Sequence, residues 1–345
     1  MDLSIASILF LDGLTNGAIY ALLGLATVLV FAVTRVIFIP QGEFVAFGAL
    51  TMAALQAGRT PGTIWFLLTL AGLATLLDAW AGWRAGQAAP SLLNSLARKL
   101  AWPLATGLLA LWAAPQQWPL LAQALLTLAL ITALGPLVYR LAYQPLADAS
   151  VLVLLIVSVG VHFMLLGFGL VFFGAEGSRN PSFWDAQFVI GPLFISGQTL
   201  MIFAATAALM VLLWLFFERS LHGKALRATA VNRLGARLMG ISTAAAGRLA
   251  FTMAAFIGAL SGLLISPSTT IVYDSGFVIG LKGFVAAVFA GLASYPGAAA
   301  GALLVGLLES FSSFWASAFK EVIVFTAILP VLLWRSWRDP HGSDE

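Results

Sequence analysis

The sequence predicts an all-α fold, a single bundle of helices that crosses a membrane several times. Two observations predict this class. First, 61% of the 345 residues are hydrophobic and only 9% are charged, whereas about a quarter of the residues of a soluble domain are charged. Second, four long windows contain no Asp, Glu, Lys or Arg: residues 100–139, 149–175, 186–217 and 249–273. A spanning helix needs about 20 predominantly apolar residues, and these continuous runs lack the alternation of barrel strands.

The apolar runs delimit about nine to eleven spans in one transmembrane domain that occupies residues 1–345. Eleven segments can be placed, near residues 5–31, 36–57, 62–83, 100–114, 118–138, 151–173, 197–217, 250–266, 276–293, 297–315 and 320–335. Lys and Arg concentrate in cytoplasmic loops, and six of the 17 lie in residues 219–248. If that segment is cytoplasmic, eleven crossings place the N-terminus outside and the C-terminus inside.

Composition and motifs also argue against several functions. The net charge of +3 is what positively charged inner loops produce, so no nucleic-acid partner is expected. The sequence has no cysteine, and its three histidines, at positions 162, 222 and 341, are too scattered to form a metal site locally. No acid–base pair or nucleophile–base motif occurs at usable spacing. We therefore expect no enzymatic activity, no metal and no bound cofactor.

The most basic stretch is residues 221–242, LHGKALRATAVNRLGARLMGIS. Five apolar residues recur along one helix face: Leu226, Ala230, Leu234, Leu238 and Ile241. This spacing predicts a short amphipathic helix that is interrupted at Gly235. Three interpretations follow from the spacing alone: a solvated loop whose arginines set the topology, a helix lying on lipid, or a helix that docks in the groove of a cytoplasmic partner.

Part of this stretch resembles the cytoplasmic coupling segment of permease subunits in branched-chain amino-acid ABC importers, the Liv-type family, and among them the H-type permease. Nine positions match that segment: Arg227, Ala228, Ala230, Ala236, Arg237, Leu238, Met239, Gly240 and Ile241. Three further stretches resemble the family: residues 11–31, LDGLTNGAIYALLGLATVLVF, residues 141–150, LAYQPLADAS, and residues 276–310, GFVIGLKGFVAAVFAGLASYPGAAAGALLVGLLES, nearly throughout.

The resemblance implies a type II-like ABC importer permease with a division of labour. This chain and a second, similar permease subunit, as a heterodimer, would form the path for branched-chain or related small amino acids. Two cytoplasmic ATPase subunits would dock on the coupling helices of the pair, which in this chain lie in residues 219–248, and a periplasmic binding protein would deliver the substrate. The chain has no G-x-x-x-x-G-K-[ST] loop, so ATP would be used by the partner subunits. The implied location is the bacterial inner (cytoplasmic) membrane, as a multi-pass protein in contact with lipid.

Ionisable residues inside apolar spans are costly and mark candidate functional positions. Glu43 lies in RVIFIPQGEFVAFGAL, residues 35–50, where Pro40 and Gly42 are expected to break the helix. Broken backbone is tolerated where it lines a cavity or is buried in protein. The resemblance aligns this stretch with the substrate path, so Gln41, Gly42 and Glu43 are candidate path residues. Phe38, Pro40 and Gln41 depart from the family's Asn, Ala and His, and a position of Glu43 near the membrane interface is the alternative.

Lys282, in GFVIGLKGFVAA, is the fourth candidate path residue and matches the family's Gly-Leu-Lys. It could instead reach the interface or cap a half-helix, or pair with Glu43 or Glu309. His162 stands alone on an apolar helix, where an interhelical hydrogen bond is commoner than a proton relay.

Two segments stand apart from the predicted core. Residues 59–117 do not match the family and predict an inserted helical hairpin around the polar joint GQAAPSLLNSLARK. Six tryptophans in or next to it would anchor at the membrane interface: Trp65, Trp80, Trp83, Trp102, Trp112 and Trp118. Residues 174–198 begin with loop residues and continue in short β-like stretches after Trp184, which predicts a cap or docking surface.

Two alternative functions stay open from the sequence. The atypical Pro40–Glu43 segment is compatible with a paralogous ABC permease for amides, urea or small carboxylates. Glu43, His162 and Lys282 could also couple uptake to an ion gradient in a stand-alone secondary transporter.

Overall fold

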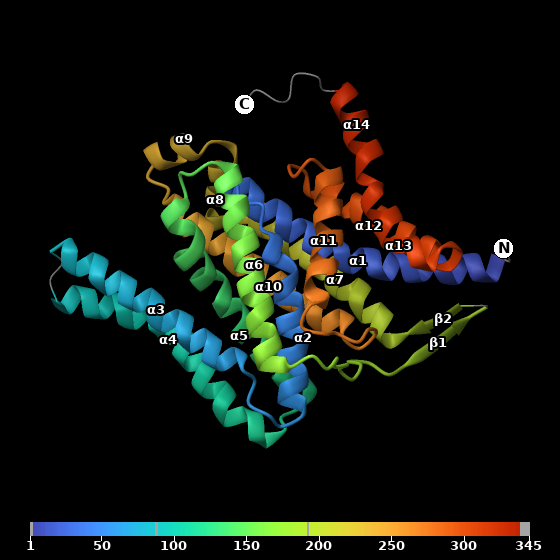
Figure 1. Ribbon diagram of the computed structural model, residues 1–345, viewed down its shortest axis with the longest axis horizontal. Helices are drawn as coiled ribbons and strands as arrows, with labels where there is room; N and C mark the ends of the chain where they lie inside the picture. The colour runs from blue at the N-terminus through green and yellow to red at the C-terminus, as the bar shows by residue number, and fades with distance from the viewer. Residues whose placement is uncertain (1–2, 87–88, 192, 339–345) are drawn as a thin grey trace.

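Two buried helices, α1 and α2, form the centre of the fold. The computed structural model describes residues 3–86, 89–191 and 193–338, and nearly every element in these ranges is a helix (Figure 1). The first half contains α1 (Leu3–Thr34), η1 (Ile39–Gly42), α2 (Glu43–Gln56), α3 (Thr63–Arg84), α4 (Ala89–Ala113), η2 (Ala114–Gln116), α5 (Leu120–Val138), η3 (Tyr139–Tyr143), η4 (Gln144–Leu146) and α6 (Val151–Phe173). The second half contains β1 (Gln187–Ile190), β2 (Leu193–Ser196), α7 (Gly197–Arg219), α8 (Leu221–Val231), α9 (Arg233–Leu238), α10 (Thr243–Ile265), α11 (Ser275–Phe289), α12 (Tyr295–Trp315), η5 (Ser317–Phe319), α13 (Lys320–Thr326) and α14 (Ile328–Arg338).

Helix α1 is surrounded by protein over most of its length. Residues 17–30 are buried without interruption, because α10, α11 and α12 pack around this stretch. A helix of 32 residues is about 48 Å long, more than the hydrocarbon thickness of about 30 Å. Figure 1 accordingly shows α1 crossing α6 at a steep angle. Small residues permit this packing, since a side chain at Gly13 or Gly17 would meet the backbone of Leu307 or Leu303 at 2.9 Å.

Helix α2 follows a break in the backbone, at the place where the sequence predicts one. Pro40 has no N–H and disfavours a helix interior, and it lies at the start of the short 3-10 helix η1. Helix α2 then begins at Glu43. Residues 40–52 are all buried, so α2 is enclosed on every side by neighbours that include α5, α6, α10 and α11.

The structure confirms a multi-pass helical membrane protein but gives a smaller count of full-length spans. By length and composition, seven helices within the described ranges can cross a membrane: α1, α3, α5 with its continuation to Leu146, α6, α7, α10 and α12. Four of the eleven predicted segments differ. Residues 36–57 are split by η1, residues 100–114 are only the second half of α4, and residues 276–293 form the 15-residue α11. Residues 320–335 divide into α13 and α14, because Pro330 is tolerated only in the first turn of a helix.

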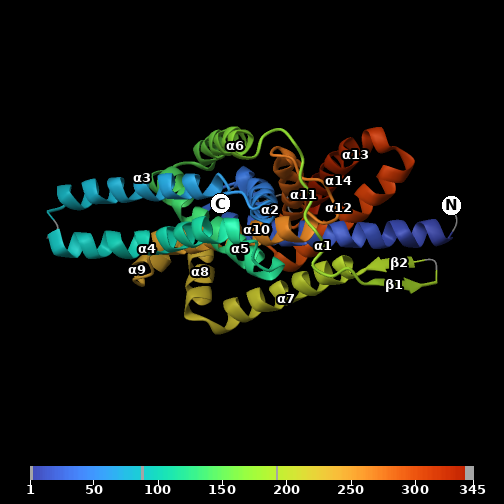
Figure 2. The ribbon, with the colours of Figure 1, turned by 90° about the horizontal axis from the view of Figure 1, so that it is seen from below.

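Helices α3 and α4 form an antiparallel pair that extends away from the rest of the bundle (Figure 2). The carboxylate of Asp78 on α3 forms an ion pair with Lys99 of α4 at 2.7 Å and a second one with Arg140 of η3. These ion pairs tie the helix pair to the end of α5. That residues 59–117 are an insertion stays a prediction.

Residues 174–198 contain the β-structure that their sequence predicts. Strands β1 and β2 pair in antiparallel register from Gln187 opposite Ser196 to Ile190 opposite Leu193. The Ser196 hydroxyl then caps α7 by accepting a hydrogen bond from the Thr199 amide at 3.1 Å. The preceding loop is fastened to the bundle, because the Arg179 side chain donates to the Pro267 carbonyl at 2.7 Å.

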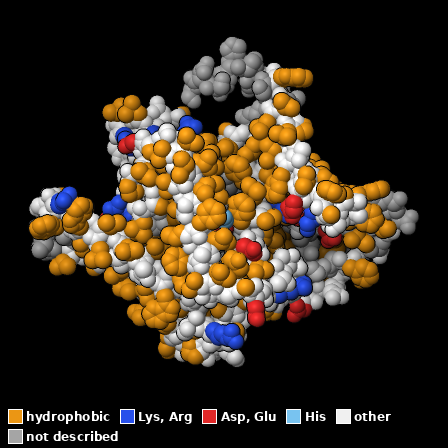
Figure 3. Space-filling view, in the orientation of Figure 1, with side chains coloured by type: hydrophobic (Ala, Val, Ile, Leu, Met, Phe, Trp, Pro, Cys, Tyr) orange, Lys and Arg blue, Asp and Glu red, His pale blue; other side chains and the backbone are white. Residues whose placement is uncertain are grey.

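The outer surface of the bundle is mostly apolar. Figure 3 shows hydrophobic side chains over most of one face of the molecule. Many large hydrophobic residues are solvent-exposed, among them Leu152, Ile156 and Phe163 of α6. Soluble monomers rarely expose apolar patches of this extent, so this surface fits contact with lipid or with other membrane subunits.

Candidate functional site

A buried carboxylate lies at the break between η1 and α2. Glu43 is completely buried, and Nδ1 of His162 on α6 lies 3.0 Å from its Oε1. Apart from this contact, both oxygens of Glu43 and Nδ1 of His162 are without polar partners in the described part of the chain. Unpaired polar atoms in an apolar interior cost free energy, and such a group is a candidate binding position.

The backbone around Glu43 is held by very close packing against α10 and α11. The Gln41 amide donates from Nε2 to the carbonyl of Ala254 at 3.0 Å, and its Oε1 is buried without a partner. Gly42 lies against the backbone of Gly276 and Gly280 of α11. Because no side chain stands between the two segments, the start of α11 is brought directly beside Glu43.

An apolar pocket of about 290 Å³ lies next to this cluster, between η1, α6 and α11. Six of its lining residues are Phe38, Ile39, Leu155, Phe277, Gly280 and Phe284. Phe277 connects the two features, because its ring also lies 4.8 Å from the imidazole of His162. Glu43 and His162 do not line the pocket themselves, and Phe277 links their cluster to its apolar wall.

We expect the substitution Gly42→Ala to destabilise the fold by about 1–3 kcal/mol, the usual effect of overpacking a tight contact. A Cβ atom there would lie 2.9 Å from Cα of Gly280 and would overlap the carbonyl of Gly276, and backbone atoms cannot rotate away. The measurement is the midpoint of thermal unfolding of the purified chain in detergent. Gly160→Ala is the control, because nothing lies within 4 Å of a Cβ at Gly160. Equal midpoints for the two variants would contradict the proposed close contact.

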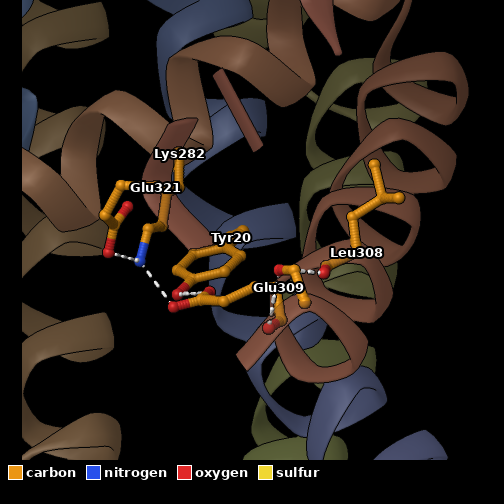
Figure 4. A network of polar contacts seen from close by, with 6 residues as sticks. Tyr20, Lys282, Leu308, Glu309 and Glu321 are labelled. Atoms are coloured by element: carbon orange, nitrogen blue, oxygen red, sulfur yellow. Dashed lines mark hydrogen bonds and ion pairs between the residues drawn. The ribbon is translucent and has the colours of Figure 1, made fainter. Parts of the chain in front are cut away.

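A second buried polar network lies on the other side of α11 (Figure 4). Lys282 donates to Oε1 of Glu309 on α12 at 2.5 Å and to Oε1 of Glu321 on α13 at 3.1 Å. The hydroxyl of Tyr20 on α1 donates to Oε2 of Glu309 at 2.5 Å. Tyr20, Lys282 and Glu309 are buried, and Glu321 is partly exposed. The network thus joins four helices. It contains the Lys282–Glu309 pair, which was one of the two pairings of Lys282 that the sequence allowed.

The structure separates the four candidate path residues into two groups. Gln41, Gly42 and Glu43 lie together, whereas Lys282 is held by α12 and α13. Gly280 faces Gly42, and a position two residues later points about 200° around the helix. Of the two partners that the sequence allowed for Lys282, the structure therefore shows Glu309 and not Glu43. The role of Lys282 in transport stays a prediction.

The coupling segment is two helices, and the predicted interruption at Gly235 was wrong. The break is at Asn232, where φ is −150° and ψ is 104°. The Asn232 side chain accepts a hydrogen bond from the Gly235 amide at 2.8 Å, so Asn232 caps α9 and Gly235 lies inside it. Asparagine is a favoured capping residue, and this was the signal in the sequence.

The break also divides the predicted apolar stripe. Leu226 is buried against the bundle, whereas Leu234 and Leu238 are exposed. Of the nine residues that carry the resemblance, Ala236 is buried and the others are exposed or partly exposed. Polar contacts hold α9 to the turn after α5, because Arg237 pairs with Asp148 at 3.0 Å and Arg233 donates to the Ala147 carbonyl at 3.1 Å.

A multi-pass bundle with broken helices and buried charges on its inner helices is the architecture of a transport permease. Residues 95–333 match the family described as the permease component of the branched-chain amino acid transport system. The chain belongs to this family, which confirms the resemblance seen in the sequence.

Individual relatives agree with this assignment. The chain is 32% identical over 212 residues to the high-affinity branched-chain amino acid transport system permease protein LivH of Escherichia coli, covering 59% of this chain and 68% of that protein. It is 31% identical over 211 residues to the corresponding permease protein BraD of Pseudomonas aeruginosa, covering 59% and 69%. Among solved structures, PsaBC from Streptococcus pneumoniae in complex with Fab aligns over 94% of this chain and 90% of that one, with a TM-score of 0.44 and 11% identity.

Sequence reasoning missed two partners of the candidate residues. His162 is the partner of Glu43, although these residues are far apart in the chain. The available signal was that Glu43 and His162 are isolated ionisable residues within apolar segments, and such groups are usually paired. Tyr20 completes the network of Lys282, and nothing in its local sequence distinguishes it from a packing residue.

Proposed function

We propose that this chain is the membrane-embedded permease subunit of an ATP-driven importer for branched-chain or related small amino acids. The observation that carries the substrate class is the Glu43 cluster. A buried carboxylate whose one polar contact among the described residues is His162 is complementary to an ammonium group, and the adjoining pocket of about 290 Å³ is lined mainly by apolar side chains. A small aliphatic amino acid carries both an ammonium group for the carboxylate and an apolar side chain for the pocket.

A second candidate substrate class is supported by the same carboxylate. Amides and urea carry N–H groups that can donate to Glu43, and they lack a long aliphatic side chain. The two classes differ in their use of the apolar pocket. Competition for uptake by leucine, alanine and acetamide would separate them, since only the first class predicts that affinity rises with the aliphatic side chain.

The coupling segment supplies a surface that fits partner ATPases. Five large apolar side chains on α8, on α9 and directly after α9 are exposed: Leu221, Val231, Leu234, Leu238 and Met239. Leu238 and Met239 are 80% and 81% exposed, and basic residues surround them. An apolar anchor with a charged rim is the usual composition of a protein interface. An ATPase subunit docked there would transmit the closure of the ATPase pair to the bundle through α8, α9 and the turn held by Arg237.

The remaining parts of the assembly follow from the family. We infer a second, similar permease subunit, a periplasmic binding protein, and a location in the bacterial inner membrane. The positive-inside rule then places residues 219–248 and the C-terminus in the cytoplasm and the N-terminus outside. The chain itself would be non-catalytic, with ATP hydrolysed by the partners.

Co-purification tests this proposal directly. The tagged chain, extracted gently from its native membrane, should bring with it a second permease and ATPases that contain phosphate-binding loops, in near-equal amounts by mass spectrometry. Recovery of the chain alone, under conditions that keep other membrane complexes intact, would instead favour an ion-coupled transporter.

We expect Gly240→Val to uncouple ATP hydrolysis from uptake while membrane insertion stays normal. Gly240 ends α9 with φ of +80°, a conformation that costs other L-residues about 1–2 kcal/mol. No atom lies within 4 Å of a Cβ there, so the effect comes from the backbone. The ratio of ATP hydrolysed to substrate taken up is measured in proteoliposomes. Gly240→Asn is the control, because asparagine tolerates this conformation, and normal coupling in the valine variant would count against the assignment.

A further inference from the structure

The space between the α3–α4 pair and the bundle contains a second, differently built pocket. It has a volume of about 440 Å³ and lies between α3, α4, α5 and α10. One part of its lining is apolar, including Trp102 and Pro103 of α4. The other part is charged and consists of Asp78, Lys99, Arg140 and Arg248. The pocket is separate from the Glu43 cluster and from the Lys282 network.

The charges of this pocket do not balance. Three cationic side chains face one carboxylate, and Asp78 already pairs with both Lys99 and Arg140. Arg248 lines the same pocket, and its side chain makes no ion pair or hydrogen bond within the ranges that the structure describes. The pocket therefore has a net positive charge and one cation available for an anionic ligand.

The position of the pocket indicates what kind of anion it can take. Figures 1 and 2 show α3 and α4 side by side, extending past the bundle, and the pocket lies where this pair meets α5 and α10. Arg248 lies in the second turn of α10, shortly after α9, and Arg140 lies at the end of α5 near the turn that holds α9. The charged part thus lies towards the end of the bundle that carries the coupling segment.

We propose that this pocket binds the headgroup of an anionic phospholipid, with Arg248 as its principal contact and Lys99 and Arg140 beside it. The phosphate would lie among the cations, and an acyl chain would lie along Trp102 and Pro103. Basic pockets between helices at the cytoplasmic side of a membrane have the charge and depth that such headgroups require. The lipid would fill the space between the α3–α4 pair and the bundle.

Native mass spectrometry of the purified full-length chain tests the proposal. The delipidated protein is titrated with phosphatidylglycerol and, separately, with phosphatidylcholine that has the same acyl chains. We expect tighter binding of phosphatidylglycerol, and we expect Arg248→Gln to weaken it about fivefold, since one Lys or Arg near an anionic headgroup contributes on the order of this factor. Arg248→Lys keeps the charge and should bind nearly as the unmodified protein does.

Arg84→Gln is the matched control. Arg84 lies at the end of α3 outside this pocket, exposed, with its guanidinium 3.8 Å from the centre of the Trp80 ring. Removing its charge should leave phosphatidylglycerol binding unchanged. Equal weakening by Arg84→Gln and Arg248→Gln, or equal binding of the two lipids, would overturn the proposal. Inorganic phosphate in millimolar excess should not displace the lipid, and full displacement would assign the site to a free anion instead.

Discussion

Replacing Glu43 with glutamine is expected to reduce substrate uptake at least tenfold without lowering the stability of the protein. The carboxylate is completely buried, and its only polar contact among the described residues is with His162 at 3.0 Å. Burying an ionised group without hydrogen-bond partners costs several kcal/mol. A neutral amide of the same shape removes that cost, and it also removes the charge that would bind an ammonium group. A tenfold loss corresponds to about 1.4 kcal/mol of binding free energy.

Two measurements on the same preparation distinguish function from structure here. Uptake of a radiolabelled branched-chain amino acid is measured in proteoliposomes that contain the complete transporter, and thermal unfolding is measured on the purified chain. Glu176→Gln is the control, since Glu176 is exposed in the loop before β1. Normal uptake with a lower unfolding midpoint would show that Glu43 is only a structural partner of His162.

Replacing Lys282 with methionine is expected to lower the free energy of unfolding by about 3–5 kcal/mol, the usual cost of removing one partner from a buried ion pair. The ammonium group is the only cation in contact with Glu309 and Glu321 in the described structure. Without it, the carboxylate of Glu309 would lie uncompensated against Tyr20. Thermal unfolding in detergent and the yield of monodisperse protein are the measurements.

A double variant and a control variant test whether the loss of stability comes from the uncompensated charge. The double variant Lys282→Met with Glu309→Gln should recover much of the lost stability, because Glu321 is partly exposed and can be hydrated. Lys320→Met is the control for the same change of side chain, since Lys320 forms no ion pair among the described residues. If the double variant is no more stable than the single one, the network does not act through charge compensation.

The parts of this fold that could be predicted are those set by local composition. Long uncharged runs can be stable only in lipid or in a protein core, so the helices and the membrane class follow directly from them. The break before α2 follows from Pro40, and the short β-structure follows from the β-like stretches after Trp184. The family was also identifiable, because residues 227–241 and 276–310 match it in sequence alone.

The candidate sites could be predicted only in part, because a sequence does not show which helix faces meet. Glu43 was identified as an isolated buried charge, but its partner His162 lies on another helix. For Lys282 the sequence left Glu43 and Glu309 open as partners, and only the tertiary structure showed that it pairs with Glu309. The capping role of Asn232 was visible in the sequence, yet the interruption was predicted at Gly235 instead.

The sequence by itself determined the class of this protein, its family and its candidate residues, because hydrophobicity and motif identity are properties of the chain. The tertiary structure decided which of those residues act together. Packing of α11 against η1 on one face and against α1 and α12 on the other separates the Glu43 cluster from the Lys282 network. The packing of α3 and α4 beside α5 likewise gathers Asp78, Lys99, Arg140 and Arg248 into one pocket. Such groupings depend on helix orientation and close approach over long sequence separations, which no local pattern specifies.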